Sequence, residues 1–160
     1  MGKWLQNVSA SAQDDFEPVI LAYQHFEREY QEFRPQLAVE KLKGQRLIDV
    51  GTKIPGLSEW VYSMWAEVNA IIAILEVRHL AAIQKQRKTY TEGYQKALTE
   101  RQVEHYAKSH DEVLAILELT AHMKYVRDLW EGLSRGVERL HYQIATIRDL
   151  RKASIEDTTI

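Results

Sequence analysis

Two pairs of side chains have the spacing of metal ligands on a helix. Glu76 precedes His79 by three positions, and Glu138 precedes His141 by the same interval. This spacing places both members of a pair on one face of a helix. In di-iron carboxylate bundles, two helices each carry such a pair and the other two helices each supply a glutamate. The pairs therefore raise the hypothesis of an iron-binding helical bundle.

Two observations make this hypothesis the least favoured one. Glu32 and either Glu104 or Glu112 would have to supply the remaining carboxylates, and such pairs arise by chance among sixteen glutamates and six histidines. Glu138 and His141 also lie beside the apolar repeat of the last helix and not on it. A buried metal centre there would need carboxylates in place of apolar neighbours. We predict solvent-facing Glu and His side chains, with no metal and no cofactor.

Other catalytic chemistry has little support in the sequence. The chain has no cysteine, which excludes disulfides, thiolate catalysis, zinc fingers and cysteine-ligated iron–sulfur clusters. His25, His105, His110 and His122 show no metal-binding spacing on one helix. The sequence has no glycine-rich phosphate loop and no nucleophile elbow. We therefore predict that the protein is not an enzyme.

A basic stretch favours a different kind of chemistry. Between Arg78 and Lys108 the chain has seven basic and three acidic residues, and tyrosines are interleaved with the cations. Cations bind phosphates, and tyrosine rings stack on the bases of single-stranded nucleic acid. The residues predicted to bind single-stranded DNA are Lys85, Arg87, Lys88 and Lys96, for phosphates, and Tyr90 and Tyr94, for bases. The alternative is a solvated helix end whose cations complement the helix dipole.

Composition and helix breakers indicate what kind of fold carries these residues. The 160 residues are 45% hydrophobic and 28% charged, and the net charge of −2 means that any nucleic-acid surface is a local patch. No apolar stretch is long enough to span a membrane and the N-terminus does not resemble a signal peptide, so we expect a cytoplasmic protein. All three prolines precede Gly56, and glycines are sparse after it. This distribution predicts an all-α fold with long helices.

The distribution of charge and the positions of proline and glycine also suggest how the chain is divided into segments. The predicted segments are a mobile N-terminus over 1–13, an acidic helical extension over 14–44, a helical domain over 45–153 and a tail over 154–160. The glycine-rich stretch Gly44–Gly56 is interpreted as a connector, followed by a helix from about Ser58 to about Thr89. Two later pairs, Thr99–Gln102 and Ser109–Glu112, match the capping box that begins a helix.

The last helix carries the most regular pattern. Its apolar residues alternate steps of three and four positions, which is the repeat of a coiled-coil seam. They are Ile116, Leu119, Met123, Val126, Trp130, Leu133, Val137, Leu140, Ile144 and Ile147. A helix of this length exceeds the width of a small globule. We predict that it mediates self-association, with an intramolecular bundle as the alternative.

Two groups of residues resemble a known family. Tyr62-Ser63-Met64-Trp65 opens a long helix shortly after Ile48-Asp49 and Thr52-Lys53, and Ile147-Arg148-Asp149-Leu150-Arg151 ends the last helix. Between them, further matching positions are Val113, Leu114, Asp128, Gly132, Val137, Tyr142 and Ile144. Over Ile48 to Ala153 the chain resembles the UvsY-type recombination mediator proteins of T-even-like bacteriophages.

The resemblance implies a function. Such mediators form homo-oligomeric rings through C-terminal helices, bind single-stranded DNA, weaken the grip of the single-strand-binding protein and help to load a RecA-like recombinase. The family's DNA-binding motif, Leu-Lys-Ala-Arg-Leu followed by tyrosines, corresponds here to Lys85-Gln86-Arg87-Lys88-Thr89-Tyr90, in which Lys88 is the best positional match and the exact motif is absent. The extension before Gly44 has no counterpart in the family pattern.

The favoured function is therefore a mediator in DNA recombination and repair. Its expected partners are single-stranded DNA, a RecA-like recombinase, the single-strand-binding protein and further copies of itself, with no membrane, in the host cytoplasm if the chain is phage-encoded. The first alternative is a helical oligomeric adaptor or structural protein without nucleic acid. The second is the di-iron bundle.

Overall fold

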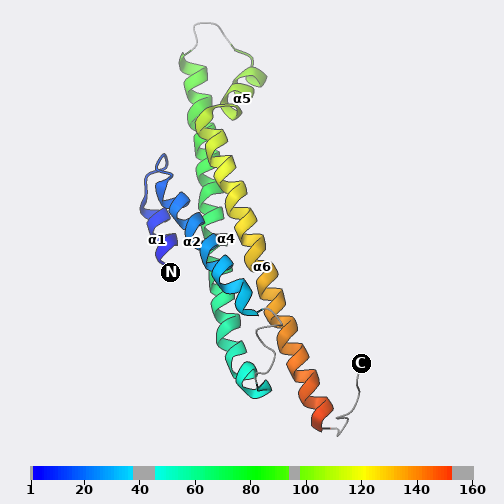
Figure 1. Cartoon of the computed structure of the whole chain (residues 1–160). Helices are drawn as coiled ribbons and strands as arrows, with labels where there is room; N and C mark the ends of the chain where they lie inside the picture. The colour runs from blue at the N-terminus through cyan, green and yellow to red at the C-terminus, as the bar shows by residue number, and fades with distance from the viewer. Residues whose placement is uncertain (1, 38–45, 94–97, 153–160) are drawn as a thin grey trace. The chain divides into compact units, whose positions relative to one another are not determined.

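The structure, a computed structural model, describes residues 2–37, 46–93 and 98–152 (Figure 1). Within these residues the chain forms helices and no strand, which confirms the predicted all-α class. The elements are α1 (Lys3–Ala10), α2 (Glu17–Phe33), the 3-10 helix η1 (Arg34–Leu37), α4 (Leu47–Gly93), α5 (Glu100–Lys108) and α6 (Asp111–Lys152). No helix of the described part carries an apolar stretch long enough to cross a bilayer.

The helices pack into two compact units. The first unit comprises Met1–Glu27 and Ala66–Arg127, and the second comprises Arg28–Trp65 and Asp128–Ile160. Helices α2, α4 and α6 each contribute one part to each unit. The units divide the chain differently from the consecutive segments predicted above, because helices distant in sequence pack side by side within each unit.

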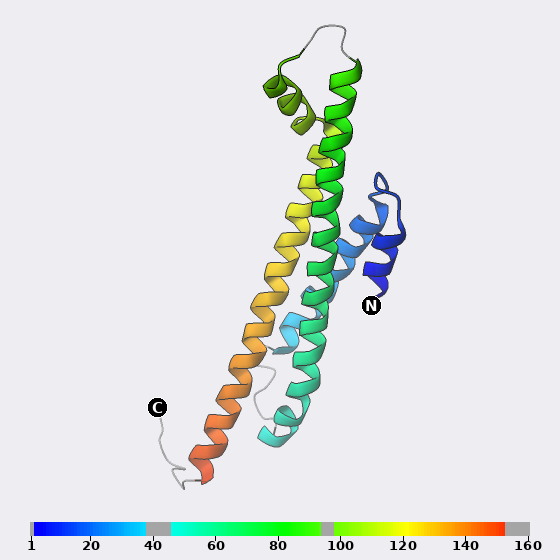
Figure 2. The same ribbon diagram turned by 180° about the vertical axis from the view of Figure 1, so that it is seen from behind.

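The first unit contains α1, the first part of α2, the later part of α4, α5 and the first part of α6 (Figures 1 and 2). Its core side chains recur every three or four positions, so that each helix buries one face. Those at most 1% exposed include Val8, Val19, Phe26, Val68, Ile71, Leu75, Ile116, Met123 and Val126.

The N-terminal segment differs from its prediction. Residues 1–13 were expected to be mobile, but most of them form α1, and Val8 is fully buried. On α4, Glu67 accepts a hydrogen bond from the Leu5 backbone N–H (2.9 Å), and the Arg78 guanidinium donates to the Val8 carbonyl oxygen (2.6 Å). These contacts satisfy free backbone groups at both ends of a helix too short to be stable alone. A helix of eight residues is too short for its few apolar residues to form a repeat that identifies it in the sequence.

An aromatic cluster forms part of the core of the second unit. Trp130 is fully buried, and its ring meets those of Tyr30 (5.9 Å between centroids) and Trp60 (5.3 Å). Trp60 in turn lies 4.6 Å from Phe33. These rings come from α2, α4 and α6, so the cluster holds one part of each long helix together. Edge-to-face contacts of this kind add to the stabilisation from buried area.

Helix α4 begins earlier than predicted. The connector expected over Gly44–Gly56 is helical from Leu47, although Pro55 stands inside it. A proline in a helix interior costs about 3 kcal/mol. Val50 and Ile54 are only 9% and 3% exposed, and burying each such side chain stabilises by about 1.5–3 kcal/mol. Their burial therefore offsets the proline.

One of the two predicted capping boxes is present. The Thr99 side chain accepts a hydrogen bond from the Gln102 backbone N–H, and the Gln102 side chain accepts one from the Thr99 N–H, so this box begins α5 as predicted.

The prediction of a second capping box, Ser109–Glu112, is wrong, although a new helix does begin close to Ser109. The Ser109 N–H and hydroxyl donate to the carbonyl oxygens of His105 (3.0 Å) and Tyr106 (3.3 Å), so Ser109 closes α5. Helix α6 begins after His110, whose carbonyl oxygen accepts hydrogen bonds from the backbone N–H groups of Val113 and Leu114. The Glu112 carboxylate is engaged by α4 and does not return to Ser109.

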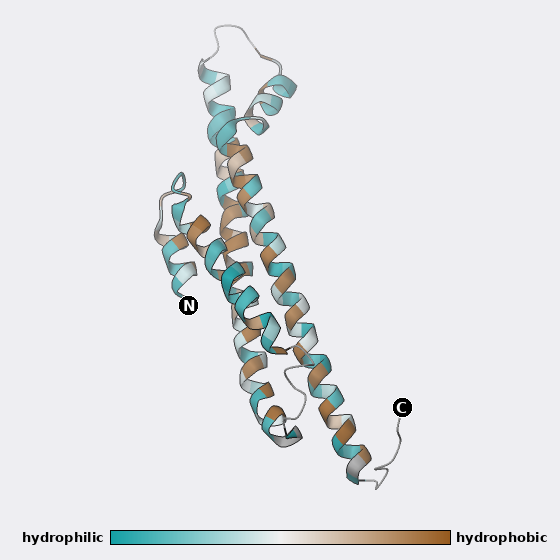
Figure 3. Cartoon of the chain, in the orientation of Figure 1, coloured by the Kyte–Doolittle hydropathy of each residue, from teal (hydrophilic) through white to brown (hydrophobic). Residues whose placement is uncertain are grey.

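The predicted long last helix is confirmed as α6, in which hydrophobic and hydrophilic residues alternate along the ribbon (Figure 3). Most residues of the predicted seam are buried by other parts of the same chain. The residues at most 9% exposed are Ile116, Met123, Val126, Trp130, Leu133 and Val137. Leu119, Leu140 and Ile144 are half-buried, and Ile147 is 41% exposed. Self-association through this seam stays a prediction.

Candidate nucleic-acid interface

Those predicted DNA-binding residues that the structure describes belong to the end of α4, in the first unit. In this region α5 lies beside the last turns of α4 and the start of α6 (Figure 2). Lys85, Arg87, Lys88 and Tyr90 are on α4, whereas Tyr94 and Lys96 lie outside the described residues. Four of the six predicted residues are therefore brought together on one short stretch of helix.

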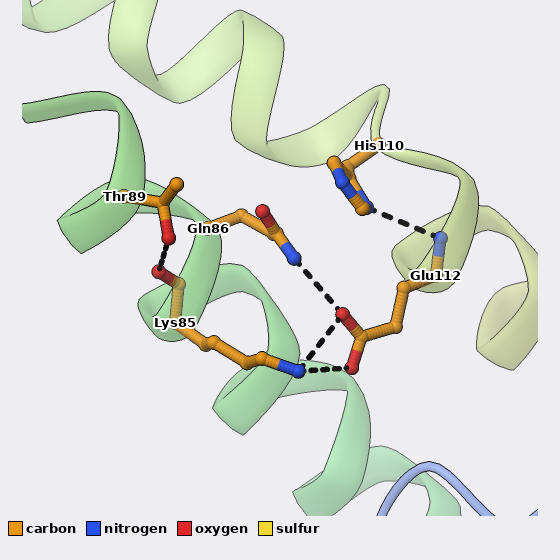
Figure 4. Close-up of polar contacts among 5 residues, drawn as sticks. All are labelled: Lys85, Gln86, Thr89, His110 and Glu112. Carbon is orange, nitrogen blue, oxygen red and sulfur yellow. Dashed lines mark hydrogen bonds and ion pairs between the residues drawn. The ribbon is translucent and has the colours of Figure 1, made fainter. Parts of the chain in front are cut away.

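Glu112, the second residue of α6, connects the two helices at this site (Figure 4). Its two carboxylate oxygens accept hydrogen bonds from the Lys85 ammonium at 3.0 and 3.3 Å, and one of them accepts a third from the Gln86 amide at 2.9 Å. The backbone N–H of Glu112 donates to Nδ1 of His110, and the Thr89 hydroxyl donates to the Lys85 carbonyl oxygen. The hydrogen bond from Lys85 holds the pKa of Glu112 below its ordinary value.

The other two described cations also have carboxylate neighbours. Arg87 lies 3.7 Å from Glu100 on α5, and Lys88 lies 4.0 Å from Glu92 one helical turn along. The side chains of Lys85 and Lys88 are 62% and 74% exposed. Exposed ion pairs contribute only about 0–1 kcal/mol, so that a phosphate group can replace the carboxylate at little cost.

A tyrosine pair stands next to the cations. The ring of Tyr90 on α4 lies 5.7 Å from that of Tyr106 on α5, with an interplanar angle of 37°. Tyr106 is 40% exposed. The sequence placed Tyr106 in the basic stretch but did not select it, because only the folding of α5 beside α4 brings it to Tyr90. A nucleic-acid base can stack on the exposed part of the Tyr106 ring.

Arg78, which also contributes to the positive charge of the stretch, is not part of this surface. It is 6% exposed, and burial lowers its pKa. Besides Val8, its guanidinium donates to the Ser11 carbonyl and hydroxyl oxygens, both at 3.0 Å, and to the Asp15 carbonyl oxygen at 3.3 Å. The guanidinium of Arg78 is bound by oxygens of the first unit and is not accessible to a phosphate backbone.

The Glu-x-x-His pairs lie apart from this site. Glu76 is exposed and forms an ion pair with Lys124 (2.8 Å), which lowers the pKa of Glu76. In the second unit, Glu138 and His141 are exposed beside a groove of about 340 Å³. Among the described residues, no three His, Asp or Glu side chains are grouped as metal ligands.

Comparison of the chain with protein-family models, with curated proteins and with solved structures found no match.

Proposed function

We propose that the protein binds single-stranded DNA at the end of α4 and acts as a recombination mediator. In this role it helps a RecA-like recombinase to assemble on DNA that is covered by single-strand-binding protein. The resemblance of Ile48–Ala153 to UvsY-type mediators supports the second part of this proposal, and the chemistry of the α4 end supports the first.

The observation that carries the proposal is the combination of exposed cations with a tyrosine pair. Lys85, Arg87 and Lys88 lie within four consecutive positions of α4. Tyr90 follows two positions later on the same helix, with Tyr106 of α5 beside it. Lysine and arginine neutralise phosphates without regard to sequence, and aromatic rings stack on any base. This combination fits a single strand better than a duplex, whose bases are already stacked.

Self-association strengthens this proposal. One copy offers three described cations, which is a small site. Several copies in one assembly present the site repeatedly to one strand, so that weak contacts combine by avidity. A mediator that binds the strand through many weak contacts can yield it to a recombinase step by step.

The test is a DNA-binding titration with a matched control. The variant Lys85→Ala/Arg87→Ala/Lys88→Ala is compared with Arg135→Ala/Arg139→Ala/Arg148→Ala, which removes the same charge from the exposed surface of the second unit. With a fluorescent oligothymidylate at about 0.1 M salt, we expect the first variant to lose affinity on the order of a hundredfold. The control should change far less.

A second candidate function has its own support. Each described cation of the site already has a carboxylate neighbour, Glu112, Glu100 or Glu92. This favours an adaptor or structural protein in which the stretch is an internally compensated surface. Equal affinities of both triple variants and the unchanged protein, or no DNA binding at low salt, would favour this function and contradict the first.

A further inference from the structure

One face of α4 in the first unit is apolar and only partly covered by the described part of the chain, because Ala66 and Ala70 are half-buried and the residues of this face from Ala73 onward are exposed. Its residues, called here the outer face of α4, are Ala66, Ala70, Ala73, Val77 and Leu80. They follow one another at steps of four, three, four and three, which is the spacing of a coiled-coil seam. The opposite face of the same helix, with Val68, Ile71 and Leu75, forms the core.

The exposure of the outer face is unusual for aliphatic side chains. Val77 is 66% exposed and Leu80 is 64% exposed, and Ala73 is exposed as well. Leu117 of α6, in the same unit, is 52% exposed. Single exposed aliphatic residues are common, but a contiguous apolar patch marks an interaction site. Because the residues follow a heptad repeat, the shape that fits them is another helix.

Residue size along the outer face indicates which helix this is. The alanines occupy the N-terminal half of the face, and Val77 and Leu80 occupy the C-terminal half. If a second copy packs in the opposite direction, the layers pair Ala70 with Leu80 and Ala73 with Val77 of the other copy. Each layer then joins a small and a large side chain, which fills the space evenly. Parallel packing would join alanine to alanine and leave voids.

We propose that the outer face of α4 is the interface between two copies of this chain, packed antiparallel. Charge agrees with this assignment. Glu76 borders the face and would approach Glu76 of the second copy near the two-fold axis, but each Glu76 carries the Lys124 ammonium at 2.8 Å. The edge of the interface is therefore neutral in both copies. A strongly charged partner would find no complementary charge there.

This interface is distinct from the self-association predicted for the α6 seam. The seam residues from Ile116 to Val137 are largely covered within the chain, whereas Val77 and Leu80 are free to meet another molecule. The inference is also independent of the proposed DNA site. None of the cations Lys85, Arg87 and Lys88 belongs to the outer face, so the loss of pairing and the loss of DNA affinity are separately measurable.

The first experiment measures mass by light scattering. We expect the unchanged chain to have at least twice the monomer mass of 18.7 kDa, and Val77→Glu/Leu80→Glu to halve it, because each carboxylate would be buried against an alanine of the other copy without a partner charge. The matched control, Ile20→Glu/Leu21→Glu, changes two exposed residues of α2 and should keep the mass. A monomeric unchanged chain, or a Val77→Glu/Leu80→Glu variant that keeps both its helicity and its mass, would overturn the proposal.

The second experiment determines the direction of pairing and uses milder variants. The chain has no cysteine, so introduced thiols are the only ones. Antiparallel packing predicts that Ala73→Cys mixed with Val77→Cys forms a disulfide-linked pair under mild oxidation, and that Val77→Cys alone does so at least about tenfold more slowly. Rapid cross-linking of Val77→Cys alone would mean parallel packing. No cross-linking in either sample would exclude the outer face as the interface.

Discussion

Two regions of α4 in the first unit, about two helical turns apart, differ in how their cationic side chains are placed: one cation is buried, and the others are exposed. Arg78 is 6% exposed and donates four hydrogen bonds to oxygens of the α1–α2 region. Lys85 and Lys88 are more than half exposed, and their carboxylate neighbours lie at or near the protein surface. In the sequence, these residues belong to one basic stretch.

The difference shows what a cation needs in order to be available to a ligand. A buried guanidinium that satisfies backbone carbonyl groups is expensive to remove, because both the charge and the carbonyl oxygens lose their partners. An exposed ammonium beside a carboxylate contributes little to stability. The region of Arg78 therefore holds the N-terminal helix in place, while the region of Lys85 to Lys88 is free to exchange partners.

The largest expected effect compares the same substitution in the two regions. Arg78→Met should lower the free energy of unfolding by about 3 kcal/mol, because the carbonyl oxygens of Val8 and Ser11 lose a charged donor. Arg87→Met, which breaks one ion pair at 3.7 Å, should lower it by less than about 0.5 kcal/mol. Urea denaturation followed by circular dichroism measures both values. Equal losses would mean that the two regions do not differ as described.

The salt dependence of DNA binding gives the next effect. If three cations at the end of α4 each neutralise one phosphate, the logarithm of the binding constant should fall with the logarithm of salt concentration with a slope of about −2 per site. A tenfold rise in salt then weakens binding about a hundredfold. Lys85→Ala/Arg87→Ala/Lys88→Ala should flatten this slope. A steep slope retained in the triple variant would move the DNA site elsewhere on the chain.

Much of the fold could be predicted from the sequence, because helices that bury one face leave a repeat of three and four. The apolar repeat of α6 and the lack of proline after Gly56 identified the long helices. The start of α4 was missed because Pro55 dominates local propensity, while the compensating burial of Val50 and Ile54 depends on tertiary packing. Helix α1 was missed for a similar reason, since the burial of Val8 and the polar contacts with α4 depend on tertiary packing.

The candidate site was predicted only in part. The sequence identified Lys85, Arg87 and Lys88 as a group of cations at a helix end. It could not show that Glu112 lies within 3.0 Å of Lys85, because that contact depends on how α4 and α6 are aligned along each other. Nor could it separate the structural Arg78 from the exposed cations, since a net charge carries no information on burial. Contacts between distant segments decide both questions.

A smaller effect is expected where a carboxylate competes with DNA for a cation. Glu112→Gln removes the charge that pairs with Lys85, so DNA affinity should rise about threefold, as expected for an exposed ion pair. The matched control is Glu118→Gln, an exposed position farther along α6 that removes the same charge. Fluorescence anisotropy with labelled oligothymidylate distinguishes them. An equal rise in both variants would reflect net charge alone and would remove any special role for Glu112.

The pH dependence of stability tests the same contact without DNA, and its effect is the smallest. The pKa of Glu112 is lowered from 4.5 in the folded chain, mainly by its hydrogen bond with Lys85. A lowered folded pKa means that the stabilisation is fully present above the ordinary value and is lost as the pH falls through the folded value. The unchanged chain should therefore exceed Glu112→Gln in unfolding free energy by about 0.5–1 kcal/mol near pH 7, and the difference should be lost as the pH falls below 4.5 and through the lowered folded pKa. Other carboxylates with lowered pKa values, such as Glu104 and Asp149, are common to both proteins and cancel in the comparison.

A difference in unfolding free energy that stays constant across this pH range would show that the Lys85–Glu112 contact does not depend on the charge of the carboxylate.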